Sequence, residues 1–142
     1  TFYVNGAEAD DAVAVYQTMY GEESIICSDD KDLLQIPGNH FNIRTRELIV
    51  VTEVEAHYRI HHQLLTGDST DNIKGIEGIG PAKAKKILES VEPKDYQLEC
   101  LKQYILKYGD KGIEYCQETF RLIYMMREFR IDLPKPKTTK WN

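Results

Sequence analysis

The stretch that decides the fold is residues 67–86, which read GDSTDNIKGIEGIGPAKAKK. Two acids, Asp68 and Asp71, open it, and closely spaced glycines follow them. These glycines allow the backbone to turn tightly, and Pro81 suits the first turn of a helix. Short β-rich and helical segments alternate before this stretch, whereas no β-rich run follows it. The sequence therefore predicts an α/β half that gives way near residue 67 to an all-helical half.

Upstream, local signals mark where the elements begin and end. Gly21 is a natural C-cap for a helix whose apolar residues fall at helical spacing. The residues Thr52-Glu53-Val54-Glu55 form a capping box, which predicts a helix from about Glu53 to Thr66. The other expected elements are the end of a strand at 2–4, a helix at 9–20, a buried parallel strand at 24–27, a helical turn at 31–35, and strands at 40–43 and 47–52.

Downstream, the pattern predicts three helices. They are expected at residues 81–90, 95–108 and about 111–129, with Pro93 and Gly109 separating them. The polar, proline-containing residues 134–142 are expected to form a loose tail.

The composition limits the class of protein. With 142 residues, 42% hydrophobic and 29% charged, the chain fits a soluble globular protein of one domain or one lobe plus part of another. No apolar run approaches the ~20 residues needed to cross a bilayer, and no secretory signal is evident at the start. The three cysteines are far apart in sequence, so we expect free thiols and a reducing, cytoplasmic location. Because the chain does not begin with Met, we expect a fragment or a processed piece.

The net charge of −5 argues at first against a nucleic-acid partner. Seven of the 23 acids, however, are clustered; without them, 16 acids remain against 18 basic residues. If bound metal neutralises the clusters, the surface left for a nucleic acid is mildly basic.

The clustered acids predict a metal site. Carboxylate oxygens are preferred ligands of Mg²⁺ and Mn²⁺, and two such ions about 4 Å apart can assist phosphodiester cleavage. One pair of acids follows the strand expected at 24–27, at the sheet edge where α/β proteins bind ligands. Each cluster alone also has a simpler explanation, as a helix-start charge, a solvated turn or a loop cap. The clustered acids are Glu8, Asp10, Asp11, Asp30, Asp32, Asp68 and Asp71.

The glycine-rich turn predicts a device that grips a nucleic-acid backbone. Ile76 and Ile79 can be buried and hold the turn in place, and the helix that starts at Pro81 presents free N–H groups. Lysines follow within its first two turns, so we expect sequence-independent, salt-sensitive binding to phosphates. A nucleotide-binding P-loop is disfavoured, because its glycine–lysine spacing is missing. The residues expected to contact DNA are Lys74, Gly75, Ile76, Gly78, Ile79, Gly80, Lys83 and Lys86.

In order and spacing, four motifs resemble those of the 5′-nuclease family, which includes phage 5′→3′ exonucleases, flap endonucleases and the nuclease domain of bacterial DNA polymerase I. Residues 8–11 resemble its E-A-D-D helix, and Asp30–Gln35 its D-K-D-x-x-Q segment. Residues 67–72 match its G-D-x-x-D-N, and 75–86 match its helix–hairpin–helix clamp. The resemblance covers roughly residues 4–90 and leaves 95–142 without a motif.

The resemblance implies a fold, a chemistry and a role for each group of acids. The fold class is α/β: the C-terminal part of a PIN-like (Rossmann-like) nuclease core at 1–66, then an all-helical helix–hairpin–helix (SAM-like) subdomain at 67–142, with its clamp at 67–90. The implied activity is metal-dependent, structure-specific 5′→3′ exonuclease and flap-endonuclease cleavage of DNA during replication or repair. Glu8, Asp10 and Asp11 would hold the first of two Mg²⁺ or Mn²⁺ ions, and the other four acids would support the second. Backbone groups at 76–80 would hold duplex or branched DNA, in this family often through K⁺.

The chain also departs from the family pattern. The family's core starts earlier, with an Asp-bearing strand and a helical arch, neither of which can be placed here. We therefore expect a monomeric chain that binds DNA, binds metal weakly and cleaves poorly unless the N-terminal part of the nuclease completes it; robust flap cleavage would contradict the fragment hypothesis. Two alternatives remain: a non-catalytic duplex-binding module, and a helical domain that does not bind nucleic acid.

Lesser candidates lie on the expected helices. His57 and His61 have the spacing of a zinc pair, but no third ligand is evident, so ordinary surface or partly buried histidines are favoured. Four tyrosines could stack on bases, although packing between helices is the commoner role. They are Tyr104, Tyr108, Tyr115 and Tyr124.

Overall fold

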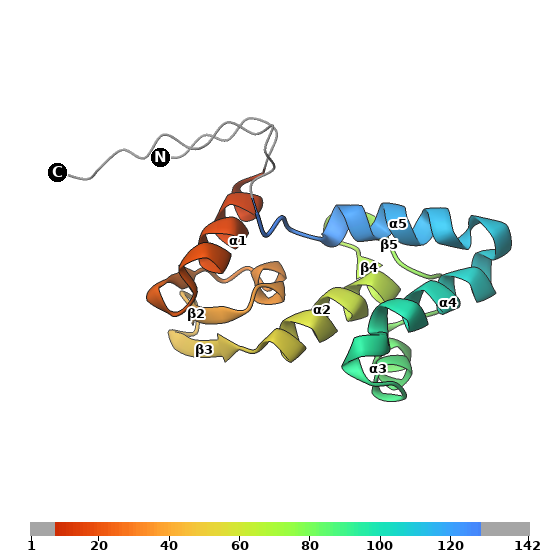
Figure 1. Ribbon diagram of the computed structural model, residues 1–142, viewed down its shortest axis with the longest axis horizontal. Coiled ribbons are helices and arrows are strands. Elements are labelled where there is room, and N and C mark those ends of the chain that lie inside the picture. Colours follow the sequence, from red (N-terminus) through yellow and green to blue (C-terminus); the bar gives the residue numbers. More distant parts are fainter. Residues whose placement is uncertain (1–7, 129–142) are drawn as a thin grey trace. The chain divides into compact units, whose positions relative to one another are not determined.

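The computed structural model describes residues 8–128, which divide into two compact units (Figure 1). The first contains the described residues up to Val51 and those from Met125 onward, and the second runs from Thr52 to Tyr124. The sequence places a boundary near residue 67, later than this division. The expected strand end at 2–4 and the expected tail at 134–142 lie outside the described residues.

The first unit begins with helix α1, Ala9–Tyr20, which has the bounds that the sequence predicts. It ends at Gly21, whose φ of 51° is a left-handed conformation that glycine adopts without strain. A short 3₁₀ turn, η1 (Gly21–Glu23), then leads into the sheet. Ala14 of α1 is fully buried and packs in a small apolar core with Ile26, Leu33 and Ile36.

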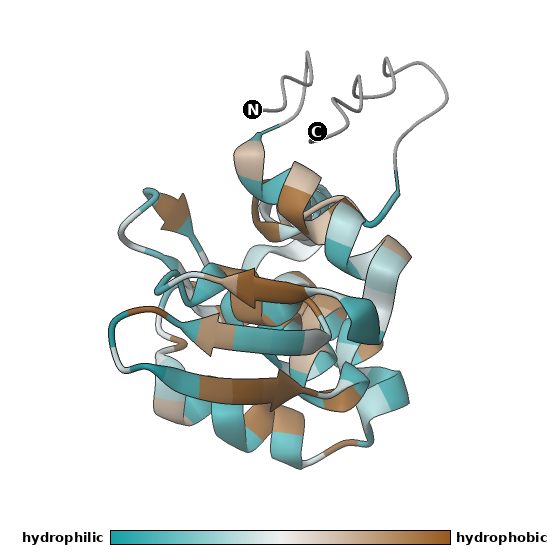
Figure 2. Ribbon diagram, turned by 90° about the vertical axis from the view of Figure 1, so that its left-hand side faces the viewer, coloured by the Kyte–Doolittle hydropathy of each residue, from teal (hydrophilic) through white to brown (hydrophobic). Residues whose placement is uncertain are grey.

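A three-stranded sheet completes the first unit. Its strands are β1 (Ile25–Cys27), β2 (Gly38–Asn42) and β3 (Glu47–Val51), in the order β1-β2-β3. β1 is parallel to β2, which pairs antiparallel with β3 in the register His40↔Ile49. Figure 2 shows hydrophobic residues on β1 and β3 on either side of the more polar β2. The 3₁₀ helix η2, Asp32–Gln35, lies between β1 and β2, where the sequence predicts a helical turn.

The predicted burial of the first strand is only partly right. β1 is parallel, but only Ile26 is buried, while Ile25 and Cys27 are exposed. The reason is that the apolar core of this unit contacts the Ile26 side of the strand, next to Ala14 of α1.

The capping box starts helix α2, Glu53–Thr66, as predicted. The backbone N–H of Thr52 donates to Glu55 Oε2 at 2.8 Å, and the N–H of Glu55 donates to Thr52 Oγ1 at 3.2 Å. These reciprocal bonds satisfy donors that a helix start otherwise leaves open. α2 packs against the three helices that follow it, which explains why the second unit begins at Thr52.

The remaining helices of the second unit surround α2. The first two of the three predicted helices are α3 (Pro81–Glu89) and α4 (Tyr96–Tyr108). A short 3₁₀ turn precedes α4, η3 (Pro93–Asp95), and another precedes α5, η4 (Gly109–Lys111). The third, α5, covers Gly112–Ile123 and ends earlier than predicted, because Tyr124 adopts an extended conformation. The prediction that no strand follows residue 67 is wrong: β4 (Gly67–Asp68) and β5 (Ile73–Lys74) form an antiparallel ladder.

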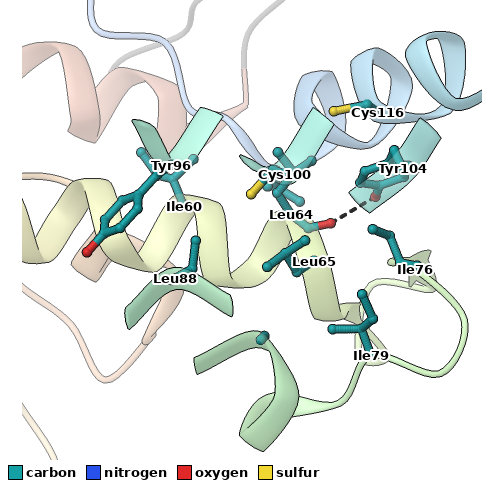
Figure 3. Close-up of a cluster of buried hydrophobic side chains, with 12 residues drawn as sticks. Ile60, Leu64, Leu65, Ile76, Ile79, Leu88, Tyr96, Cys100, Tyr104 and Cys116 are labelled. Atoms are coloured by element: carbon teal, nitrogen blue, oxygen red, sulfur yellow. Dashed lines mark hydrogen bonds between the residues drawn. The ribbon is translucent and has the colours of Figure 1, made fainter. Parts of the chain in front are cut away.

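The core of the second unit is large and gathers side chains from every helix (Figure 3). Leu64 and Leu65 of α2 are buried there with Leu88 of α3. The hydroxyl of Tyr104 donates to the carbonyl oxygen of Leu64 at 2.8 Å, so this buried ring keeps a hydrogen-bond partner. Burial raises the pKa of the Cys100 thiol to about 12, which keeps it protonated.

His61 is the buried titratable group on α2. Its Nδ1 lies 2.8 Å from the carbonyl oxygen of His57, while its Nε2 is buried without a hydrogen-bond partner among the described residues. Burial lowers the pKa of His61 below its ordinary value of 6.5, despite the opposing bond to His57. The folded protein therefore holds this ring in its neutral form.

The free energy of unfolding should fall as the pH drops below about 6.5, because the unfolded chain then binds a proton that folded His61 resists. The loss can reach about 1.4 kcal/mol per pH unit until the pH passes the lowered pKa. Urea unfolding at pH 7.5 and 5.5 measures it. His61→Leu should reduce this difference, whereas the neighbouring His62→Gln should preserve it. An unchanged pH dependence in His61→Leu would contradict the assignment.

Among residues 8–128, no helix has both the length and the apolar character needed to cross a membrane.

Candidate active site and nucleic-acid interface

The first acidic cluster lies at the start of α1. Glu8 is the exposed N-cap residue, and Asp10 and Asp11 are half-buried in the first turn. Asp11 accepts two backbone hydrogen bonds: Oδ2 from the N–H of Glu8 at 3.2 Å and Oδ1 from the N–H of Met126 at 2.9 Å. The carboxylate of Asp11 thus stabilises the helix start, and each oxygen retains a further lone pair for a ligand.

The second cluster follows β1, as the sequence predicts. The backbone N–H of Asp32 donates to Asp30 Oδ1 at 2.9 Å, so Asp30 shapes the turn into η2. Asp29, to which the sequence assigns no role, pairs with Arg44 of the β2–β3 turn at 2.6 Å. Arg44 thereby offsets one negative charge beside Asp30.

A segment far along the chain links these two clusters. Consecutive N–H groups, those of Met125 and Met126, donate to Gln35 Oε1 at 3.1 Å and to Asp11 Oδ1 at 2.9 Å. Arg127 also donates to the carbonyl oxygen of Gln35 at 2.6 Å. Because neighbouring residues lie only about 3.8 Å apart, the start of α1 and the end of η2 must be close together. No sequence motif marks residues 125–127, since backbone atoms make two of their three bonds.

The third cluster lies in the second unit. Asp68 is half-buried in β4, and three donors surround its carboxylate. Oδ1 accepts from the N–H groups of Thr70 and Asp71 at 2.8 and 3.4 Å, and Oδ2 accepts from Gln63 Nε2 at 3.2 Å. Asp71 is exposed. The structure therefore holds Asp68 in one orientation.

The β4–β5 ladder joins this third cluster to the glycine-rich turn. Asp68 pairs with Ile73 and Gly67 with Lys74, so the acid lies on the same small element that leads into the turn. A Cβ atom on Gly67 would lie 2.3 Å from the backbone nitrogen of Gly75, so the two strands approach too closely for a side chain there. Gly67 also has a φ of 71°. This contact determines where the turn begins relative to Asp68.

The glycine-rich turn, residues 75–80, is a hairpin anchored by two isoleucines. Ile76 and Ile79 are buried in the core of the second unit, as predicted. The N–H of Ile76 donates to the carbonyl oxygen of Leu65 at 2.9 Å, and the N–H of Ile79 donates to that of Ile76 at 3.0 Å. Gly78, between them, has a φ of 83°, which strongly favours glycine.

Gly80 differs from the other hairpin glycines. Its φ of −86° suits any residue, and a Cβ atom there would meet no atom of residues 8–128 within 4 Å. Gly80 is the N-cap of α3 and provides no side-chain cap. In the described part of the chain, neither the backbone nor the packing requires a glycine at this position, which leaves room for an external group to approach the start of α3.

The surface around the start of α3 suits an anion. The N–H groups of Gly78 and Gly80 have no acceptor among the described residues, and the first N–H groups of a helix lack partners within it. Lys74, Lys83 and Lys86 are exposed and have no carboxylate partner in the described part of the chain. Of the nearby lysines, Lys85 pairs with Glu89 at 3.7 Å.

The seven acids are thus divided between the units. Asp68 and Asp71 belong to the second unit with the hairpin, and the other five belong to the first. Within the first unit, residues 125–127 connect the cluster of Asp11 to that of Asp30 and Asp32 through Gln35. The assignment of all seven as metal ligands stays a prediction.

The lesser candidates have structural roles. His57 Nε2 lies 2.9 Å from the carbonyl oxygen of Pro93, so both histidines of the proposed zinc pair bond the backbone. Tyr104 is buried in the core and Tyr124 stacks on Phe120 at 5.0 Å, which supports packing for these two tyrosines. Tyr108 contacts the hairpin, a role that no sequence pattern indicated.

Sequence comparison identifies nucleases as relatives of the chain, although no protein-family model matches it. It is 36% identical to the 5′-3′ exonuclease of Mycoplasmopsis pulmonis over 60% of the chain and 33% of that protein. It is 30% identical to the flap endonuclease Xni of Shewanella baltica over 90% of the chain and 53% of that protein. The chain therefore spans about half, or less, of the relatives it matches.

Comparison of the fold with solved structures gives a match of the same kind. The crystal structure of the T5 D15 protein with metal ions superposes with a TM-score of 0.63 at 24% identity, covering 87% of this chain and 49% of that one. At this identity the match shows the fold alone, and it agrees with the predicted α/β class. The resemblance to the 5′-nuclease family that the four motifs predict is therefore confirmed, in sequence and in fold.

Proposed function

We propose that this chain carries much of a divalent-metal-dependent, structure-specific 5′→3′ exonuclease or flap endonuclease that cleaves DNA in the cytoplasm during replication or repair. One observation supports this most strongly: Asp68 lies on the β4–β5 ladder that leads directly into the hairpin. Gly67 and Gly75 meet backbone to backbone, so an acid that suits a metal lies at a set place relative to a loop that suits phosphates. A nuclease needs this spatial relation between its acids and its grip on DNA.

The hairpin would hold the backbone of duplex or branched DNA. The N–H groups of Gly78 and Gly80 and the first turn of α3 offer donors to a phosphate, and the exposed lysines add charge. Backbone N–H groups and lysines contact phosphates and not bases, so the binding would be independent of the DNA sequence and would weaken as the salt concentration rises. We also propose that a K⁺ ion binds at the hairpin, between its backbone groups and the DNA.

The donor set of the three acidic clusters fits Mg²⁺ or Mn²⁺. All seven ligands are carboxylates, and hard oxygen donors favour these ions over zinc. Asp68 is held in one orientation by Gln63 and Thr70. Two bound ions would supply an activated water and stabilise the leaving oxygen of the cleaved phosphodiester. Within the first unit, the segment that bonds Asp11 also bonds Gln35, so the acids there form a second candidate group of ligands.

A second candidate function is a duplex-binding module without catalysis. The observation that favours it is that every contact described for the hairpin comes from the second unit, Thr52–Tyr124. The grip on DNA would then need neither the first unit nor a metal.

Cleavage of a 5′-labelled flap substrate tests the proposal. We expect slow cleavage near the flap junction in Mg²⁺ and none in EDTA, because the chain spans only about half, or less, of the nucleases it matches. A gel-shift assay in EDTA should show binding that weakens steeply with salt. Binding without any cleavage at high protein concentration would favour the second candidate, and the absence of both would exclude both.

A further inference from the structure

The end of α4 makes two polar contacts with one hairpin residue, Glu77. The phenolic oxygen of Tyr108 accepts a hydrogen bond from the backbone N–H of Glu77 at 3.2 Å. Next to it in sequence, Lys107 Nζ lies 3.5 Å from Glu77 Oε2. Two consecutive residues of one helix therefore hold both the main chain and the side chain of the hairpin's acid.

The ring of Tyr108 is itself held by aromatic neighbours. It lies 6.1 Å from the ring of Tyr104 and 5.2 Å from that of Tyr115, which meets it edge-on. Tyr115 is on α5, and Gly112 at the start of that helix lets the two backbones touch: a Cβ atom there would lie 2.6 Å from Ile105 Cα. The packing of α4 on α5 thus determines where the phenolic oxygen is presented to the hairpin.

The backbone N–H groups of residues 76–80 fall into two sets. Those of Ile76, Glu77 and Ile79 donate to acceptors within the second unit. Those of Gly78 and Gly80 have no acceptor in the part of the chain that the structure describes. The engaged donors fix the shape of the turn, and the open ones are available to a ligand.

We propose that Tyr108 is a positioning residue for DNA binding: its hydroxyl holds the Glu77 amide so that the N–H groups of Gly78 and Gly80 stay available to a phosphate. This inference rests on the proposed function, because it assumes that the hairpin binds DNA. Lys107 assists by offsetting the charge of Glu77, the only acid between Lys74 and Lys86. Since this ion pair is largely exposed, its effect is on repulsion of phosphate more than on stability.

Tyr108→Phe tests the proposal, with Tyr115→Phe as the matched control. Each variant loses one hydroxyl and keeps its ring, but the hydroxyl of Tyr115 makes no hydrogen bond to the hairpin among the described residues. We expect Tyr108→Phe to bind flapped duplex DNA about 2- to 10-fold more weakly, the effect of one ordinary hydrogen bond. The slope of affinity against salt should stay the same, because no charge is lost. Tyr115→Phe should bind as the wild type does.

Amide hydrogen exchange gives a readout that needs no DNA. In the wild-type chain the Glu77 amide should exchange more slowly than those of Gly78 and Gly80, and Tyr108→Phe should accelerate Glu77 selectively, by about 10-fold. Equal exchange of the three amides in the wild type, or unchanged affinity in a folded Tyr108→Phe, would overturn the proposal. If the wild type protects Glu77 but binds no DNA, the proposed function fails while the contact itself stands.

Discussion

Replacing Asp68 with Asn should abolish metal-dependent cleavage and leave DNA binding intact or slightly stronger. The amide has nearly the shape of the carboxylate and can still accept the N–H of Thr70, and the Gln63 side chain can rotate to offer its oxygen instead. The substitution removes one negative charge, which attracts a divalent cation and repels a phosphate. We expect at least about a 100-fold loss of cleavage rate, measured in single-turnover assays on a flap substrate.

The matched control is Asp29→Asn. Asp29 lies next to Asp30 of the second acidic cluster, but its carboxylate already forms a salt bridge with Arg44 at 2.6 Å. Both side chains are substantially exposed. Neutralising it changes the net charge by the same amount as Asp68→Asn while leaving the ladder untouched. Cleavage should therefore change little. Equal losses in the two variants would indicate a general charge effect and contradict a specific role for Asp68.

The elements that could be predicted from sequence are those with local causes. Helix α2 begins where Thr52 and Glu55 exchange hydrogen bonds three residues apart, and α1 ends where Gly21 turns left-handed. Such signals lie within one turn of the element that they delimit, so the sequence alone reveals them. The same holds for Pro81 at the first position of α3.

The elements that sequence missed depend on contacts between distant residues. β4 and β5 have two residues each, too few for any pattern, and they pair because Gly67 and Gly75 allow their backbones to meet. α5 carries an apolar pattern beyond Ile123, but the N–H groups of Met125 and Met126 bond side chains of the first unit instead of continuing the helix. A pattern of apolar residues cannot reveal such competition.

The site residues show the same division. The acids and the hairpin could be found because carboxylates and glycines have recognisable chemistry at short spacing. The residues that hold them could not: Gln63 orients Asp68, Met126 bonds Asp11, and Tyr108 bonds Glu77. These supporting bonds use ordinary side chains or backbone groups, and two of the three span more than 30 residues.

Gly80→Asp should weaken DNA binding strongly while keeping, or slightly raising, thermal stability. Gly80 has an ordinary φ of −86° and open space around its Cβ position, so the new side chain fits without strain. Aspartate is a favoured N-cap, and its charge interacts well with the start of a helix. That charge, however, would occupy the place proposed for a phosphate. We expect at least about a 10-fold loss of affinity, and a smaller loss at high salt, where charges are screened.

Gly80→Asn separates the charge from the added volume. Asparagine is nearly the same size and an equally good N-cap, so its thermal unfolding should match that of the aspartate variant closely. If the open N–H groups at Gly78 and Gly80 bind phosphate, the asparagine variant should lose much less affinity than the aspartate variant. Equal affinity of the wild type and Gly80→Asp, with both folded, would mean that DNA does not approach the start of α3. Because Gly80 is the hairpin glycine that neither packing nor backbone conformation requires, this pair of variants tests binding without disturbing the fold.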